Sequence, residues 1–336
     1  MKTSNLHCAC LVAGFVLIVS LGLGRPADAI VNENCGCHSR IMEEKKFPHL
    51  PVREGKCALC HKPSGKKHPR FKKEAFIFTD NGKSGLCNEC HSRKDSMKFV
   101  HGPVAKGDCL LCHDVHQSDN KAQLKVPLDQ LCYLCHPKPT FDRIFPHAPI
   151  SGGNCTGCHD PHQSDVKYML KGDKSILCFL CHQQTKFTGT SAHKPVAEGK
   201  CDDCHTTHGT NLPHLLKQNF PEPFYLPFEK SNYALCFSCH NNQLADEQRT
   251  DTLTNFRNGY INLHFIHVNK AGKGRSCKTC HDPHASSQYR LISSKISGFG
   301  KWSIPIRYLK TDTGGTCVVG CHKHKTYNRI EPVINP

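Results

Sequence analysis

Apolar positions along the 336-residue chain fall into one long run and many short groups. The long run, from Leu11 to Leu23, follows a charged start and precedes Ala27-Asp28-Ala29, the pattern of a secretory signal peptide over residues 1–29. No later stretch is apolar enough to span a membrane as a helix. Short groups such as LDQLCYLCH and KSILCFLCH predict helical turns capped by Asp129 or Ser175. The segments between them are rich in Pro, Gly and Lys and predict irregular structure, with no strand expected.

One unit of sequence occurs five times in this pattern. Each unit opens with a histidine, continues to a cysteine cluster that ends in histidine, and closes with a second, plainer cluster. The opening histidines are 52, 46, 46 and 74 residues apart, so the fourth unit carries an insertion. We therefore divide the chain into a signal peptide (1–29), an N-terminal segment (30–48) and five repeats at 49–100, 101–146, 147–192, 193–266 and 267–336.

The spacing of the cysteines predicts the cofactor. Of 24 cysteines, 20 lie in ten clusters, nine of the form Cys-x-x-Cys-His and one Cys-x-x-x-Cys-His. Cys-x-x-Cys-His is the attachment signature of c-type haem, in which two thiols bond to the porphyrin and the adjacent imidazole binds iron. A zinc site or a redox dithiol does not require histidine at that place ten times, and cysteines three apart rarely form an unstrained disulfide.

The clusters therefore predict ten covalently attached haem c groups. The expected thioether residues are Cys57, Cys60, Cys87, Cys90, Cys109, Cys112, Cys132, Cys135, Cys155, Cys158, Cys178, Cys181, Cys201, Cys204, Cys236, Cys239, Cys277, Cys280, Cys317 and Cys321. The expected proximal iron ligands are His61, His91, His113, His136, His159, His182, His205, His240, His281 and His322.

Ten further histidines lie at positions that recur from repeat to repeat. One opens each repeat, eight residues before its first cysteine, or ten in the fifth repeat. Another follows the first proximal histidine by three residues, or by seven in the first repeat. Their number equals that of the irons, which predicts that they are distal ligands, mostly of haems other than the one attached beside them. These residues are His49, His68, His101, His116, His147, His162, His193, His208, His267 and His284.

Two imidazoles on every iron bear on potential and on activity. Met42, Met97 and Met169 are the methionines left after signal removal, and none recurs with the repeats, so methionine ligation and the high potentials that come with it are not expected. An iron with six ligands has no open position for nitrite, hydroxylamine or oxygen. The sequence therefore predicts outer-sphere electron transfer, with no catalytic residue and no enzyme activity.

The amount of chain for each haem predicts the fold class. About 307 residues after the signal serve ten haems, so each haem has about 30 residues around it, too few for an independent core. We expect a mostly irregular structure with short α-helices, an elongated multihaem array of five two-haem repeats in which the haems form the core.

The formal net charge of +16 does not require a nucleic-acid partner. Ten haems add about 20 negative propionate charges, and ten oxidised irons return about 10 positive charges, which brings the holoprotein near neutrality. Lysine-rich segments such as GKKHPRFKK then pair with propionates, face solvent, or form a docking patch for an acidic partner.

The alternation of HxPVxxGxCxxCHxPH with a plain LCxxCH, from His49 to His322, resembles the doubled-CxxCH multihaem c-type cytochromes. Ten clusters in a chain of this length are similar to the decahaem periplasmic subunits that sit inside outer-membrane porins of metal-reducing bacteria. The segment GFGKWSIPIRYLKTDTGGTCVVGCH looks like the last unit of such cytochromes. The resemblance implies haem wires with bis-histidine ligation. The Cys-x-x-x-Cys-His cluster and the insertions at 209–235 and 241–266 depart from the family pattern.

The resemblance also implies a place in the cell. It predicts an exported protein of the periplasm, associated with the outer membrane, with other multihaem cytochromes and an outer-membrane β-barrel porin as partners. A soluble periplasmic shuttle to a terminal reductase, a subunit of an extracellular cytochrome filament, and a reductase are the alternatives. The histidine count within the chain already suffices for the irons, which argues against a filament that shares ligands between copies.

Several residues stay outside this scheme. Only one residue separates Cys35 from Cys37, so a single-thioether eleventh haem is disfavoured, and a disulfide elsewhere or a distal role for His38 stays open. His264 is an alternative to His267 as the distal ligand of its repeat. His214 and His324 are expected to face solvent. The aromatic insertion at 211–233 is either a loop that covers a haem edge or a surface that binds a partner.

Overall fold

The computed structural model describes residue 41 and residues 45–67, 75–77, 84–298 and 301–336. The predicted signal peptide, Cys35, Cys37, His38 and His68 lie outside the described residues. The chain divides into two compact units, one of residues 1–91 and 114–123 and the other of residues 92–113 and 124–336. Among the described residues, no helix has both the length and the apolar character needed to cross a bilayer.

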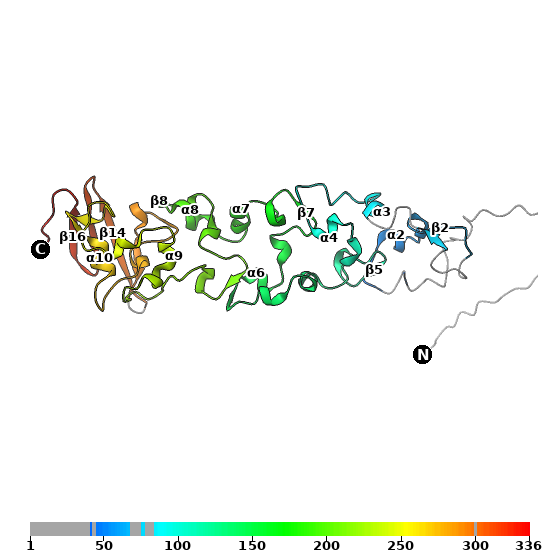
Figure 1. Cartoon of the computed structure of the whole chain (residues 1–336), viewed down its shortest axis with the longest axis horizontal. Helices are drawn as coiled ribbons and strands as arrows, with labels where there is room; N and C mark the ends of the chain where they lie inside the picture. Colours follow the sequence, from blue (N-terminus) through cyan, green and yellow to red (C-terminus); the bar gives the residue numbers. More distant parts are fainter. Residues whose placement is uncertain (1–40, 42–44, 68–74, 78–83, 299–300) are drawn as a thin grey trace, which may run out of the picture. The chain divides into compact units, whose positions relative to one another are not determined.

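Short helices and irregular segments make up most of the described chain, as predicted (Figure 1). The α-helices are α2 (Leu50–Arg53), α3 (Ser84–Asn88), α4 (Gly102–Ala105), α5 (Leu128–Leu131), α6 (Ala148–Ser151), α7 (Lys174–Phe179), α8 (Lys194–Ala197), α9 (Ala234–Phe237) and α10 (Leu263–Val268). The 3₁₀ helices are η3 (Cys57–Leu59), η4 (Cys109–Leu111), η5 (Lys121–Gln123), η6 (Cys132–Leu134), η7 (Lys138–Thr140), η8 (Cys155–Gly157), η9 (Lys167–Met169), η10 (Gln184–Phe187), η11 (Cys201–Asp203), η12 (Pro213–Leu215), η13 (Lys230–Tyr233), η14 (Asn242–Ala245), η15 (Cys277–Thr279) and η16 (Tyr289–Leu291).

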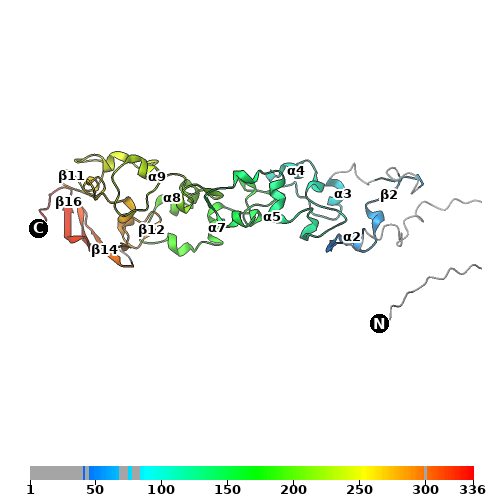
Figure 2. The same ribbon diagram turned by 90° about the horizontal axis from the view of Figure 1, so that it is seen from below.

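The strands are mostly two residues long. They are β1 (Phe47–Pro48), β2 (Lys62–Pro63), β3 (Phe76–Ile77), β4 (Phe99–Val100), β5 (Gln117–Ser118), β6 (Phe145–Pro146), β7 (Gln163–Ser164), β8 (Ser191–Ala192), β9 (Gly209–Thr210), β10 (Arg257–Asn258), β11 (Ile261–Asn262), β12 (Ala285–Ser286), β13 (Lys295–Ser297), β14 (Ser303–Lys310), β15 (Gly314–Val319) and β16 (His322–Asn328). Figure 2 shows the helices of the second unit, from α4 to α9, following one another in sequence order.

The first four repeats begin with the same local structure. An extended histidine precedes a four-residue helix, α2, α4, α6 or α8, with proline in the first turn. A glycine with φ between 65° and 73° follows each of these helices, and a 3₁₀ helix then starts at the first cysteine. The predicted caps Asp129 and Ser175 are wrong, because α5 begins directly after Pro127 and α7 after Asp173.

Neighbouring repeats are joined by antiparallel pairs of these short strands. The strand before an opening histidine pairs with the strand that follows the Cys-His-x-x-His segment of the next repeat, in the pairs β1–β5, β4–β7, β6–β9 and β8–β12. Residues 114–123 of the second repeat accordingly belong to the compact unit of the first repeat. Each repeat thus contributes part of its chain to the structure of the repeat before it.

The C-terminal end forms a four-stranded antiparallel sheet in the order β13-β14-β15-β16, which contradicts the expectation that the chain has no strands. In β14 the side chains alternate, with Ile304 and Ile306 buried between exposed neighbours, which is the period of a strand with one covered face. Pro305 stands between the two isoleucines and hides this pattern. Figure 1 shows the sheet at the C-terminal end of the second unit.

A small side-chain core is formed by residues that precede this sheet in the chain. Tyr233, Ala245 and Val268 are buried together, and partly buried residues of the fourth repeat's insertion, including Leu226 and Phe228, pack against them. Cys277 of the ninth cluster is also in contact with this group. The aromatic insertion therefore packs against a cysteine cluster of the fifth repeat.

The glycine that ends each repeat helix gives a test of this local structure. Gly153→Ala should destabilise the holoprotein by more than about 1 kcal/mol, because φ is 65° there and an added Cβ would lie 2.6 Å from Cβ of Asp129. The adjacent control Gly152→Ala, with φ of −86° and no neighbour closer than 3.7 Å, should change stability by less than about 0.5 kcal/mol. Guanidinium unfolding followed by far-ultraviolet circular dichroism measures both. Equal midpoints for the two variants would contradict the expectation.

Candidate functional site

Histidine rings lie in pairs throughout the described residues. In nine pairs the ring centroids are between 5.9 and 6.4 Å apart and the ring planes differ by 8° to 26°. Every pair joins one histidine that ends a cysteine cluster to one histidine outside the clusters. The pairs are His91–His49, His61–His116, His136–His101, His113–His162, His182–His147, His159–His208, His240–His193, His205–His284 and His281–His264.

The separation fits a metal ion held between two imidazoles. A metal–nitrogen bond is about 2 Å long and the ring adds about 1 Å on each side, so rings on opposite sides of one metal have centroids about 6 Å apart. Among the described residues, no group of three or more His, Cys, Asp or Glu side chains is placed to hold a metal. Two protein ligands leave the other positions of an iron to a macrocycle, which fits haem and not zinc.

Eight of the nine pairs follow two rules of connection, and His281–His264 follows neither. The histidine of a repeat's second cluster pairs with the opening histidine of the same repeat, as in His182 with His147. The histidine of its first cluster pairs with the histidine three residues after the first cluster of the next repeat, as in His159 with His208. The second rule explains why the short strands of adjacent repeats pair, since the strand that follows His208 pairs with the strand that precedes His147.

Backbone carbonyls fix the opening histidines. The Nδ1 atoms of His49, His101, His147 and His193 lie 2.9 to 3.1 Å from carbonyl oxygens of the next repeat. A carbonyl oxygen only accepts, so Nδ1 carries the proton and donates it, and Nε2 keeps the lone pair that binds a metal. The hydrogen bonds select the ring orientation as well as the tautomer.

A second set of carbonyls fixes histidines of the first clusters. The Nδ1 atoms of His159, His205 and His281 donate to carbonyl oxygens nine residues later, at distances of 2.9 to 3.0 Å. The acceptors belong to Tyr168, His214 and Arg290. Each acceptor has a positive φ, between 56° and 63°, which turns its carbonyl back toward the ring.

An aspartate sets the distal histidine of the Cys-His-x-x-His segment. Oδ1 of Asp160 accepts from the backbone N–H of His162 at 2.8 Å and of Gln163 at 3.3 Å. Burial opposes ionisation of this carboxyl, but the two N–H groups outweigh burial and keep the pKa of Asp160 below its usual value. Asp114 holds His116 and Gln117 in the same way.

Burial favours the neutral, metal-binding form of four imidazoles that face cluster histidines. Burial lowers the pKa of His162, His208 and His284 below the usual value for histidine. Burial lowers the pKa of His264 further, to about 3. A neutral imidazole offers a nitrogen lone pair, whereas a protonated ring has none free.

The cysteines of the ten clusters are available for attachment. All 20 are free thiols, and in six of the ten clusters a 3₁₀ helix starts at the first cysteine. Burial raises the pKa of the Cys132 thiol to about 11, and the thiol of Cys155 in the next cluster adds to this rise. Cys178 and Cys201 form a similar pair, as do Cys280 and Cys317. Successive clusters of the second unit are therefore neighbours in space.

The tenth cluster differs from the others in its backbone. Cys317 lies on β15 and His322 begins β16, and the register of the two strands shifts between Cys317 and Val319. The extra residue of the Cys-x-x-x-Cys-His spacing is thus taken up in a β-hairpin and not in a 3₁₀ turn. His322 lies close enough to His267 for its charge to contribute to the lowered pKa of His267, whose main cause is burial.

Three histidines that are not among the ligands predicted from the sequence have distinct surroundings. His264 faces His281, a pairing that the sequence analysis raises only as an alternative for the fifth repeat. His214 is exposed, as predicted, but its Nε2 contacts the Glu222 carboxylate and its carbonyl accepts from His205. His324 is exposed on β16. His68 lies outside the described residues.

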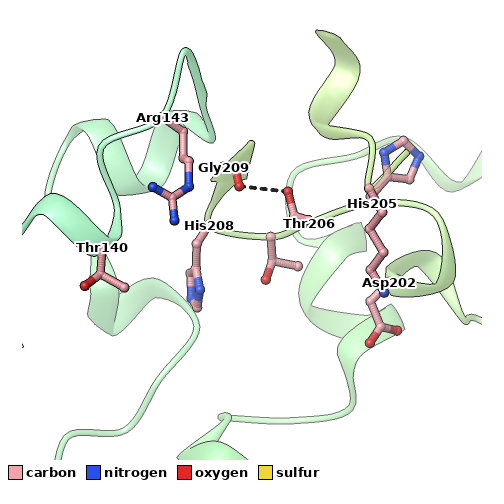
Figure 3. Close-up of a pocket in the computed structure, with 9 residues that line it drawn as sticks. Thr140, Arg143, Asp202, His205, Thr206, His208 and Gly209 are labelled. Atoms are coloured by element: carbon pink, nitrogen blue, oxygen red, sulfur yellow. Dashed lines mark hydrogen bonds between the residues drawn. The ribbon is translucent and has the colours of Figure 1, made fainter. Parts of the chain in front are cut away.

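A polar cavity of about 350 Å³ lies next to one histidine pair (Figure 3). His208, Thr140 and Arg143 line one part of it and Asp202 lies on the other side, and Lys217 is also among the lining residues. Hydroxyls and two cations around an open space beside an imidazole suit a carboxylate, such as a haem propionate.

Similarity to known proteins agrees with this geometry. Residues 49–96, 101–140, 147–187 and 193–245, more than half of the chain, match the doubled CXXCH motif family. The fifth repeat, with its hairpin cluster, lies outside these stretches. No curated protein matches the chain. The repeated motif indicates covalent binding of haem c and electron transfer. The chain belongs to the doubled CXXCH motif family of multihaem c-type cytochromes.

Proposed function

We propose that the protein is a decahaem c-type cytochrome that conducts electrons by outer-sphere transfer between bis-histidine haems. The observation that carries the proposal is the set of nine imidazole pairs, each with one cluster histidine and a centroid separation of about 6 Å. For the tenth cluster we propose His267 as the partner of His322, because the opening histidine pairs with the second-cluster histidine in each of the first four repeats.

Haem c, when attached, supplies an iron that gains or loses one electron while it keeps six ligands. The chain's own contribution is to hold both imidazoles still. A backbone carbonyl fixes Nδ1 of one ring in several of the pairs, as at His147, which faces His182 and donates to the carbonyl of Thr207. Rings fixed in this way change little when the charge changes, which keeps the reorganisation on electron transfer small.

The order of the clusters supports a continuous path through the second unit. Cys112 and Cys135 are neighbours, and so are Cys204 and Cys239. With the contacts already described, each cluster of this unit from the third to the tenth adjoins the next in sequence. We propose that electrons pass along the chain in this order.

Export and location are part of the proposal. The apolar run from Leu11 to Leu23 supports a signal peptide, and attachment of c-type haem outside the cytoplasm requires export. We propose a periplasmic protein associated with the outer membrane, with other multihaem cytochromes and a β-barrel porin as partners. A soluble periplasmic shuttle to a terminal reductase is the second candidate.

Removal of one distal imidazole should open one iron. His147→Ala should convert about one iron in ten from low spin to high spin and allow it to bind carbon monoxide when reduced, because His182 would keep no partner. The exposed His324→Ala variant serves as control and should stay fully low spin. Electron paramagnetic resonance and carbon monoxide titration measure both. A His147→Ala protein that stays fully low spin would contradict the ligand pairing.

The number of haems is tested by intact mass. The mature protein should carry ten haem groups, and replacement of both Cys317 and Cys321 by Ser should remove one, because attachment needs these thiols. Replacement of Cys35 and Cys37 by Ser should leave ten. Mass spectrometry together with the pyridine haemochrome assay gives the count. Eleven haems in the unaltered protein, or ten after loss of Cys317 and Cys321, would contradict this assignment.

The place in the cell is tested by isolation from the native host. Outer membranes extracted in mild detergent should yield this cytochrome with a stoichiometric β-barrel partner, identified by mass spectrometry. Recovery in the osmotic-shock fraction without a barrel would favour the periplasmic shuttle.

A further inference from the structure

The second connection rule leaves a difficulty at the end of the chain. In four successive repeats, the histidine of the first cluster pairs with a histidine of the following repeat, in the pairs His61–His116, His113–His162, His159–His208 and His205–His284. The fifth repeat has no successor within the described residues. By this rule His281 would have no partner in the chain.

His264 stands in the place where that partner is needed. Its ring centroid is 6.4 Å from that of His281, within a few tenths of an ångström of the separation in the other pairs, and the ring planes differ by 21°. It comes from α10, at the end of the insertion that lengthens the fourth repeat. The insertion thus brings an imidazole to the ninth cluster from the preceding repeat instead of the following one.

The surroundings of His264 hold its ring in this position. Asn262 is completely buried, caps α10 by accepting from the backbone N–H of His264 at 3.0 Å, and donates to the carbonyls of Leu244 and Glu247. The hydroxyl of Thr254 lies 3.1 Å from Nδ1 of His264. The ring of Phe256 packs against that of His264, with 5.1 Å between the ring centroids. These contacts occupy Nδ1 and leave Nε2 for a metal.

The neighbouring His267 is not part of this pair. Its Nδ1 lies 2.7 Å from the carbonyl of Leu263, one turn earlier in α10. His322 of the tenth cluster is among the charges that act on it, and no ring contact with His281 is found for it among the described residues. Histidines three apart lie on adjacent parts of a helix surface, so α10 can supply one imidazole to each of two successive clusters.

The start of the array shows the complementary departure. Residues 30–48 contain none of the ten clusters, so the second rule assigns no cluster histidine to a histidine three residues after His61. Ser64 occupies that position, whereas the other four repeats have histidine there. The first repeat thus has Ser64 at the position where the later repeats have a ligand histidine. At the ninth cluster, where the following-repeat histidine is missing, His264 takes its place.

We propose that His264 is the sixth iron ligand at the ninth cluster and that it closes the ligand array within a single chain, so that no neighbouring copy supplies an imidazole. The proposal rests on the proposed bis-histidine decahaem function and names the ligand at one site of it. It assigns His267 to the tenth cluster and gives His68 no ligand role.

The test compares variants of the full-length holoprotein. His264→Ala should make about one iron in ten high spin and able to bind carbon monoxide, and His264→Ala with His267→Ala should open about two in ten. His68→Ala, the matched control, should stay fully low spin. Exogenous imidazole should restore the low-spin state of His264→Ala. A low-spin His264→Ala protein together with an open iron in His68→Ala would overturn the proposal.

The variant His264→Met replaces the imidazole by another iron ligand. It therefore tests the assignment without leaving the iron open, which could itself disturb folding. It should show the sulfur-to-iron charge-transfer band and a more positive potential for about one haem in ten, because methionine ligation raises the potential. Absence of both changes would overturn the assignment. Several high-spin irons in the unaltered protein would contradict the proposed bis-histidine ligation as a whole. That result would be distinct from failure of the His264 assignment. Dilution to monomer, checked by sedimentation, should leave the unaltered protein fully low spin, and appearance of a high-spin iron would show a ligand from another copy.

Discussion

Nine of the ten cluster histidines face a second imidazole from another segment, and that constraint organises the structure. A metal with two trans imidazoles needs them on opposite sides, so one segment of chain cannot easily supply both. The Cys-His-x-x-His segment therefore holds a cluster histidine of its own repeat and, three residues later, completes the repeat before it. His159 and His162 illustrate this, since they pair with His208 and His113 respectively. The two-residue strand pairs follow from the same crossing of chain.

Apart from the paired histidines, the described residues form little side-chain core. Among the described residues only a few apolar side chains are buried, and the one core cluster, around Tyr233, lies against the ninth cluster. Backbone hydrogen bonds between repeats replace side-chain packing over most of the chain, as between His101 N–H and the carbonyl of His162. The family motif indicates covalent haem c, and the space between the paired imidazoles is where we propose that the haems lie.

The sequence predicts the parts of this site whose chemistry depends on side chains. The clusters, the short helices before them and the recurring histidines can be read from spacing alone. Which histidines face each other cannot, because pairing depends on how repeats cross, and His264 breaks the repeat spacing altogether. The C-terminal sheet is missed for another reason. Its tenth cluster also ends in Cys-His and has only one extra residue between the cysteines, and the alternation of Ile304 and Ile306 that indicates a strand surrounds a proline.

Backbone strain shows why part of the site has no sequence signature. The non-glycine residues with positive φ among the described residues occur in four adjacent pairs, each beginning nine residues after the histidine of a first cluster. Their side chains share nothing: the pairs are Ala122–Gln123, Tyr168–Met169, His214–Leu215 and Arg290–Leu291. Left-handed geometry costs about 1–2 kcal/mol per residue, and none of these residues favours it. The carbonyls that Tyr168, His214 and Arg290 turn toward cluster histidines explain why the strain is retained, because the demand falls on the direction of the backbone and leaves the side chain free to vary.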